Sequence, residues 1–200
     1  ALRVTDRITF QAMEAFIHNL NTMHSRAGAQ VPFSSINFGT DITPEGRMVV
    51  ENYLKALDKG LGKGETPIFP IAIFKVKEGV NYFPEDINYD LFKLAIKVSA
   101  KRLFPNFSFI DSPFNKQYYK EGRYETEITY MGCRTRVMSD INDPENEEVI
   151  GRGNLSFTSI NLVRLGIKHG ILTHETPDIE GFYEELDHLI DLTKYQLLER

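Results

Sequence analysis

The sequence predicts an α/β fold in which helices and strands alternate along a 200-residue segment. Amphipathic stretches with identifiable ends are interleaved with short apolar or alternating stretches, which is the pattern of an α/β architecture. The chain shows no internal repeat, low-complexity tract or interdomain linker. Its 42% hydrophobic content is enough for a sizeable core in a chain of this length. We therefore expect residues 1–200 to form a single segment of one domain.

Four segments have the apolar spacing of amphipathic helices: residues 6–23, 43–60, a third that starts at Asn88 or Asp90 and ends at 103, and about 179–200. Asp6 is a suitable N-cap for the first of them. The second has the clearest boundaries, because Thr43 and Pro44 combine an N-cap with a first-turn proline. Gly60 can end this helix in the left-handed conformation.

Six segments are expected to be strands: residues 33–38, 66–77, 107–110, 128–131, 134–138 and 155–162. The second is apolar enough to be mostly buried, although Pro67 and Pro70 indicate that part of it is extended without full ladder pairing. In the last segment, residues 155, 157, 159 and 161 alternate with 156, 158, 160 and 162, as the side chains on the two faces of a strand would. Between the last two, the acidic run 140–148 is interpreted as a turn or loop.

Composition excludes several classes of partner. The net charge is −5, and lysines and arginines are scattered among acidic residues without a basic block, so we expect no nucleic-acid partner. No apolar run approaches the roughly 20 residues that span a bilayer. Residues 1–10 also lack the apolar stretch and cleavage site of a signal peptide. We expect a cytoplasmic protein with no membrane contact.

Two familiar ligand-binding motifs are incomplete. The glycine-rich segment 60–66 resembles a phosphate-binding loop, but that pattern requires glycine in place of Leu57 and serine or threonine in place of Gly64. We interpret it as a surface loop. The five histidines lack the H-E-x-x-H spacing, and one cysteine cannot form a cysteine-clustered zinc site. We expect no metal site within these residues.

The functional prediction depends on the single cysteine, Cys133. A lone cysteine is more often an inert, buried small hydrophobe than a chemically used thiol. Here it lies between a glycine and two arginines in the string TYMGCRTRV, residues 129–137. A second unusual string, GRGNLSFTSINL, follows at residues 151–162.

These two strings, with MHSRAGAQVPFSSINFGTD at residues 23–41 and GETPIFPIAIFKVKEG at residues 64–79, closely resemble the anaerobic, glycyl-radical class of ribonucleoside-triphosphate reductases. The resemblance covers essentially the whole chain, with four separated motifs in the same order. It implies a ten-stranded α/β barrel of two five-stranded halves, with a finger loop that carries the radical cysteine through the centre. Residues 1–200 would be a central part of that catalytic barrel.

The resemblance also implies the anaerobic reduction of ribonucleoside triphosphates to deoxyribonucleoside triphosphates, with formate as the reductant. A glycyl radical, installed by a separate S-adenosylmethionine iron–sulfur activase, would oxidise Cys133 to a thiyl radical. The family's glycyl-radical string, its structural zinc site and its second active-site cysteine are absent from these residues. We therefore expect no cofactor in this segment, no turnover by the segment alone, and a homodimeric parent protein.

Further site residues follow from the same resemblance. Asn154 would lie beside Cys133 and bind a substrate hydroxyl or formate, while Met131 and Gly132 would line the substrate pocket. The residue pattern alone would make Asn154 an ordinary turn residue and Met131 a packing residue. Gly132 would allow a tight loop tip and a close approach to the ribose.

The first helix and the loop after it resemble the dimer-interface helix and relay loop of ribonucleotide reductases. That loop transmits the identity of a bound deoxynucleotide or ATP effector to the substrate. Arg26 and Gln30 could donate hydrogen bonds to a base or phosphate, and Gly28 could let the loop switch. The pattern alone favours an ordinary helix with a glycine C-cap.

Two alternative functions remain compatible with these motifs. The first is a non-catalytic nucleotide-binding or regulatory module on the same scaffold. The second is another glycyl-radical enzyme that acts on small acids, but such an enzyme would not explain the loop that resembles an effector relay.

Overall fold

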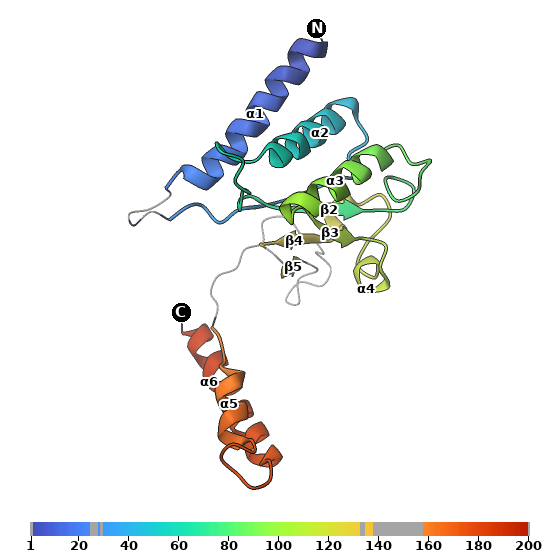
Figure 1. Ribbon diagram of the computed structural model, residues 1–200. Coiled ribbons are helices and arrows are strands. Elements are labelled where there is room, and N and C mark those ends of the chain that lie inside the picture. The colour runs from blue at the N-terminus through green and yellow to red at the C-terminus, as the bar shows by residue number, and fades with distance from the viewer. Residues whose placement is uncertain (1, 25–27, 29, 133–134, 138–157, 200) are drawn as a thin grey trace. The chain divides into compact units, whose positions relative to one another are not determined.

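The structure is a computed structural model that describes residues 2–24, 28, 30–132, 135–137 and 158–199. The chain forms two compact units, Ala1–Arg152 and Gly153–Arg200, and each is described by itself (Figure 1). In the described part of the chain, no helix has the length and apolar character needed to cross a membrane. The assignment of all 200 residues to one barrel segment stays a prediction.

The described residues of the first unit contain a three-stranded parallel sheet with the order β1-β2-β3 (Figure 1). Its strands are β1 (Ser35–Phe38), β2 (Ile71–Val76) and β3 (Asn106–Phe109). The helices α2 (Pro44–Lys59) and α3 (Tyr89–Arg102) connect successive strands. Two consecutive β-α-β units therefore build the sheet, which confirms the α/β prediction.

One side of the sheet packs against helices and forms the core. Phe74 of β2 is fully buried, and its ring lies 5.6 Å from Phe38, 5.9 Å from Phe92 and 6.0 Å from Phe107, measured between ring centroids. The helix α1 (Leu2–Thr22) adds Ile17 to the same core. The other large buried members of this core come from α2 and α3: Val50, Tyr53, Leu54, Leu57, Leu91 and Val98.

The boundaries of α2 agree with the sequence prediction except for one conformation. Thr43 Oγ1 accepts a hydrogen bond from the Gly46 N–H at 3.1 Å, and Pro44 occupies the first turn. Gly60 ends the helix with φ 81° and ψ −171°, so the predicted left-handed helical conformation is wrong although φ is positive. The extended ψ leads directly into the loop in which Leu61 N–H bonds to Glu65 O at 2.9 Å. That loop is exposed from residue 62, as expected of a surface loop.

Two other boundaries differ from the prediction. α1 starts at Leu2, so Asp6 is not its N-cap; it accepts a hydrogen bond from Asn52 of α2 at 2.8 Å. The strand expected over 66–77 is limited to β2, because Pro67 and Pro70 have no N–H to donate. In front of β2, the Asn21 amide replaces a strand partner by accepting from the N–H groups of residues 68 and 69 at 2.9 and 3.0 Å.

The second unit contains two described helices, α5 (Leu162–His169) and α6 (Ile179–Leu198). α6 confirms the final predicted helix. The strand expected over 155–162 is wrong in its described part, because residues 158–161 are not in a strand and residue 162 begins α5. The Asn161 side chain explains this outcome, since its oxygen caps the helix by accepting from the Arg164 N–H at 2.9 Å. Residues 140–148 lie outside the described residues.

Candidate functional site

The candidate site is the β-hairpin that contains Cys133 in its sequence. Its strands are β4 (Thr129–Met131) and β5 (Thr135–Val137), which pair antiparallel with Met131 opposite Thr135. Gly132 follows β4 with φ 57°, a conformation that favours glycine. Cys133 itself lies outside the described residues, so its position at a loop tip stays a prediction.

Two polar side chains of β1 attach β4 to the sheet. The Asn37 amide donates to Tyr130 O at 2.8 Å and accepts from Tyr130 N–H at 3.0 Å, so it pairs with a backbone residue as a neighbouring strand would. Ser35 Oγ accepts from the Gly132 N–H at 3.1 Å. The two contacts, Asn37 with residue 130 and Ser35 with residue 132, are two residues apart on each side. Together they set the register of β4 against β1.

These side chains lie on the face of the sheet opposite the core. Side chains alternate along a strand, so Ser35 and Asn37 point away from the helix-facing Phe38. The strand pairing places Asn37 beside Ile73 and, on the next strand, Ser108 beside Lys75. The ribbon accordingly shows the helices α1, α2 and α3 on one side of the sheet and β4 on the other (Figure 1).

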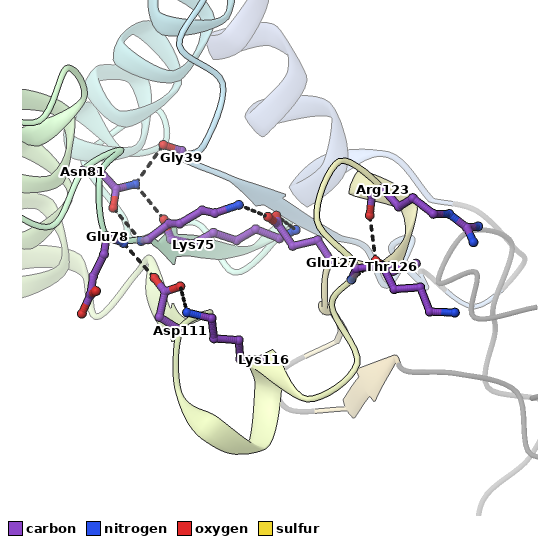
Figure 2. A network of polar contacts seen from close by, with 11 residues as sticks. Gly39, Lys75, Glu78, Asn81, Asp111, Lys116, Arg123, Thr126 and Glu127 are labelled. Carbon is purple, nitrogen blue, oxygen red and sulfur yellow. Dashed lines mark hydrogen bonds and ion pairs between the residues drawn. The ribbon is translucent and has the colours of Figure 1, made fainter.

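A buried ion cluster adds a third attachment just before the hairpin. Lys75 Nζ and Lys77 Nζ each lie 2.9 Å from a different carboxylate oxygen of Glu127, two residues before β4 (Figure 2). Lys75 is only 7% exposed and Glu127 only 8%, so this pairing is largely removed from water. A charge at such a depth is costly without its partner, and the cluster therefore specifies where the chain enters the hairpin.

The ionisation of this cluster follows from competing effects. Burial alone would raise the pKa of Glu127, but the charges and hydrogen bonds of Lys75 and Lys77 outweigh it and lower that pKa below its ordinary value. Burial opposes the charge of Lys77 as well, but its hydrogen bond to Glu127 prevails and raises the pKa of the ammonium. The carboxylate and the ammonium are therefore both charged at neutral pH.

The Asn81 side chain fixes the backbone around the two lysines of the cluster. The fully buried Asn81 amide donates to Lys75 O at 2.8 Å and to Gly39 O at 2.9 Å, and it accepts from Lys77 N–H at 2.9 Å (Figure 2). One side chain thus joins the ends of β1 and β2. The backbone from which Lys75 and Lys77 extend is therefore fixed by hydrogen bonds to the Asn81 side chain.

The second strand of the hairpin has its own anchor. Arg136 of β5 donates to Phe114 O at 3.2 Å and to Asn115 Oδ1 at 3.1 Å, and its guanidinium lies 5.0 Å from the centroid of the Phe114 ring. Both partners belong to the short helix α4 (Pro113–Lys116), which follows β3. The hairpin is therefore attached to β1 through β4 and to α4 mainly through β5, with a 3.5 Å hydrogen bond from Asn115 to the Tyr130 hydroxyl as a further contact.

Close packing also restricts the position before Cys133. A Cβ atom added to Gly132 would lie 3.3 Å from the Phe33 ring. Phe33 in turn packs edge-on against Phe69, with 5.0 Å between centroids. Glycine is thus favoured here by both its positive φ and the nearby ring. Met131, the other predicted pocket residue, is half-buried at the end of β4.

The remaining predicted site residues are only partly described. Asn154 and Arg26 lie outside the described residues, so their proximity to Cys133 or to an effector stays a prediction. Gly28 has φ 91° and is exposed, as is Gln30.

The anchors of the hairpin were not predicted from the sequence. Ser35 and Asn37 interrupt an otherwise apolar-aromatic strand, and Lys75 interrupts the apolar run IAIFKV. A polar residue that alternates with apolar ones inside a buried strand was the available signal. Its partner could not be found locally, because Glu127 is 52 residues further along the chain.

Residues 3–200 match the family described as anaerobic ribonucleoside-triphosphate reductase. Proteins of that name from Enterobacteria phage T4, Haemophilus influenzae and Escherichia coli are 35%, 30% and 30% identical to it over 186, 201 and 194 residues. These matches cover 92%, 100% and 96% of this chain but only 30%, 26% and 25% of the relatives. The chain therefore spans between a quarter and a third of their length.

The family match and the three relatives agree, and together they extend over nearly every residue. The resemblance found in the four sequence strings is thereby confirmed. This chain belongs to the anaerobic ribonucleoside-triphosphate reductase family.

Proposed function

We propose that this chain is the central catalytic segment of a reductase that converts ribonucleoside triphosphates to deoxyribonucleoside triphosphates without oxygen, with Cys133 as the residue that becomes a thiyl radical. The observation that carries the proposal is the attachment of the hairpin at Ser35, Asn37 and Glu127, on the sequence that leads to Cys133. Hydrogen-atom transfer needs a sulfur held at a defined distance from the substrate. A hairpin with fixed register provides such a support.

The proposed reaction balances with formate as the reductant. The thiyl sulfur of Cys133 takes the 3′ hydrogen atom of the ribose, and the 2′ hydroxyl leaves as water with one added proton. Formate supplies two electrons and one proton and is oxidised to carbon dioxide, so that a hydrogen replaces the hydroxyl on the 2′ carbon, while the hydrogen atom returns from Cys133 to the 3′ carbon. A sulfur–hydrogen bond is similar in strength to the ribose carbon–hydrogen bond, so the transfer can proceed in both directions.

The neighbouring residues would have supporting roles. Asn154 would orient a substrate hydroxyl or formate, and Met131 and Gly132 would line the pocket. In the parent protein, the three parallel strands would belong to one five-stranded half of a ten-stranded barrel, with the hairpin as its central finger. The face that bears Ser35 and Asn37 would then point into the barrel.

Partners of the parent protein follow from the same proposal. A glycyl radical outside this segment, made by an S-adenosylmethionine iron–sulfur activase, would oxidise Cys133. Deoxynucleotide or ATP effectors would act through the loop that contains Arg26, Gly28 and Gln30, next to a homodimer interface formed by α1. The structural zinc site would also lie outside this segment.

The test is Cys133→Ser in the full-length parent protein. Serine keeps the shape, but its oxygen–hydrogen bond is too strong to pass the radical on. The activated variant should keep its glycyl radical by electron paramagnetic resonance and should make no deoxyribonucleotide from any of the four ribonucleotides with formate. The control Thr135→Ser changes an exposed residue of the same hairpin and should retain product formation.

Product formation by Cys133→Ser would overturn the assignment of Cys133. A parent protein that binds nucleotides but yields no product even with Cys133 intact would instead favour a non-catalytic regulatory module on the same scaffold.

A further inference from the structure

A cluster of potential metal ligands lies between the two helices of the second unit. His169 is the last residue of α5, His174 lies in the connecting loop, and Asp178 is the N-cap of α6. One ligand atom from each lies within 4.8 Å of the other two, and His169 Nδ1 is 3.2 Å from Asp178 Oδ2. Bonds of about 2.0–2.2 Å to a tetrahedral zinc ion place neighbouring ligands about 3.3–3.6 Å apart, close to this separation. At least one pair therefore already has the separation that a shared ion requires.

Both imidazole rings are oriented by an acceptor on their other nitrogen. His169 Nε2 is 2.6 Å from Glu185 Oε2, and His174 Nε2 is 3.0 Å from Lys168 O. Metal-binding histidines commonly donate their second ring N–H to a carboxylate or a backbone carbonyl, which leaves the first nitrogen with a lone pair for the metal. In both rings, Nδ1 is therefore the nitrogen left for the metal. The planes of the two rings are nearly parallel, with an interplanar angle of 7°.

The carboxylate is similarly oriented. Asp178 Oδ1 accepts from the Gly181 N–H at 3.0 Å as the cap of α6, while Oδ2 faces His169. One oxygen therefore has a structural role and the other is directed toward the two histidines.

We propose that His169 Nδ1, His174 Nδ1 and Asp178 Oδ2 bind one divalent transition-metal ion of the zinc class. Imidazole nitrogen and carboxylate oxygen are ligands that zinc accepts, and three protein ligands leave a fourth position for water. His174 is exposed, so an ion can reach the site from solvent. The bound ion would join the end of α5 to the start of α6. This inference does not depend on the proposed reductase function.

The proposed site would depart from the expectation of no metal in these residues, and its sequence spacing explains why it was not expected. The H-E-x-x-H pattern describes two histidines on one helix. Here His169 ends a helix, His174 lies in a loop and Asp178 is a helix N-cap. Five and four positions separate them in sequence, so folding of the α5–α6 turn is needed to bring them together.

Protons compete with the ion for this site. Four groups face His169: Glu185, Asp178, Lys168 through its ion pair with Glu185, and His174. A proton on Nδ1 must leave before the ion binds, so metal affinity should fall as the pH is lowered and binding should release protons.

The experiment uses the 200-residue chain after treatment with a chelator. Zinc binding is measured by isothermal titration calorimetry, and cobalt binding by the visible absorption of the tetrahedrally coordinated ion. We expect one ion per chain, with at least a 10-fold loss of zinc affinity in His174→Ala and a loss of about 10- to 100-fold in Glu185→Gln, which removes only the orienting group. The control His188→Ala changes an exposed histidine of α6 and should bind like the wild type.

Asp178→Asn separates ligation from folding. The asparagine oxygen can still cap α6, so the helix content should be unchanged by circular dichroism while zinc affinity falls. The proposal is overturned if His174→Ala and Asp178→Asn bind zinc as tightly as His188→Ala. It is equally overturned if zinc leaves the imidazole resonances of His169 unchanged in a nuclear magnetic resonance titration, since the cluster would then bind protons only.

Discussion

The two faces of the three-stranded sheet hold their neighbours by different physical means. On the helix-facing side, Phe38, Phe74 and Phe107 pack against one another and against α2 and α3. The hairpin-facing side also buries Ile73, but its contacts to β4 include the directional hydrogen bonds of Asn37 and Ser35. Both faces bury side chains of β2, but the hydrogen bonds that specify a register lie on the second.

The two faces therefore contribute differently to the free energy of unfolding and to the placement of the hairpin. Apolar burial is non-directional and roughly proportional to area, so it stabilises a packed layer without choosing between nearby alignments. A hydrogen bond weakens steeply outside a narrow range of distance and angle. The helix face should therefore dominate the free energy of unfolding, whereas the hairpin face should determine where residues 129–137 lie.

The largest effect is expected in the aromatic core. Phe74→Ala should lower the free energy of unfolding by about 3–5 kcal/mol, because the removed ring is 0% exposed and leaves a cavity. Urea denaturation of the 200-residue chain measures this loss. Phe109→Ala removes a ring that is 53% exposed at the end of β3 and should change the value by only about 0.5 kcal/mol. Equal losses in the two variants would contradict the conclusion that the buried ring of Phe74 carries this part of the stability.

The buried ion cluster should be next in size. Glu127→Gln keeps the shape but leaves Lys75 without a counter-charge, and loss of one partner of a buried pair costs about 3 kcal/mol at the lower end of the known range. Glu51→Gln is the matched control, because its pair with Lys55 is 45% exposed on both sides and contributes only about 0.3–0.5 kcal/mol. If the two variants unfold at the same urea concentration, the cluster does not hold the hairpin.

The same cluster predicts how stability depends on pH. The pKa of Glu127 is lowered from its ordinary 4.5, so its contribution is complete above that value and is lost as the pH falls through the lower, folded-state pKa. The pKa of Lys77 is raised from 10.5, so its contribution is lost as the pH rises through the higher folded-state value. The difference in unfolding free energy between wild type and Glu127→Gln should therefore shrink in acid below about pH 4.5. A difference that persists at pH 2 would show that Glu127 acts through packing instead of charge.

The smallest effect is the most local. Asn37→Asp keeps an acceptor for the Tyr130 N–H but loses the donor to Tyr130 O, which should cost about 1–2 kcal/mol. Amide hydrogen exchange should become faster at residue 130 while that of Phe74 is unchanged. Asn106→Asp, an exposed position on the same face of β3, should leave both rates as they were. Faster exchange throughout the sheet would mean that Asn37 supports the core instead of the register.

The sequence predicted elements whose causes are local. Thr43 and Pro44 identified the start of α2 because a cap acts within one turn. The same reasoning missed α5, since the alternating pattern of residues 155–162 concealed the cap at Asn161. The prediction of Asp6 as an N-cap was wrong for the opposite reason. Aspartate is a common cap residue, but Asp6 lies inside α1 and makes a tertiary contact with Asn52.

The candidate site shows the same division. The family resemblance points to Cys133, Met131 and Gly132 as site residues, which stays a prediction, and the glycine has the positive φ that suits a tight loop. The anchors depend on long-range pairing, since Asn37 and Tyr130 are 93 residues apart. Neither periodicity nor composition contains that pairing, so only the folded chain reveals it.

The bond between Asn37 and Tyr130 has a consequence for how this segment can vary between species. The hydrogen bonds of Asn37 with residue 130 and of Ser35 with Gly132 are made to main-chain atoms. Nearly any side chain at residue 130 would leave its contact intact, whereas proline would remove the required N–H. The two sides of the contact therefore tolerate mutation unequally. A change at residue 130 loses only side-chain contacts, such as the 3.5 Å hydrogen bond that Asn115 donates to the Tyr130 hydroxyl, while the side chain at residue 37 has few substitutes that both donate and accept.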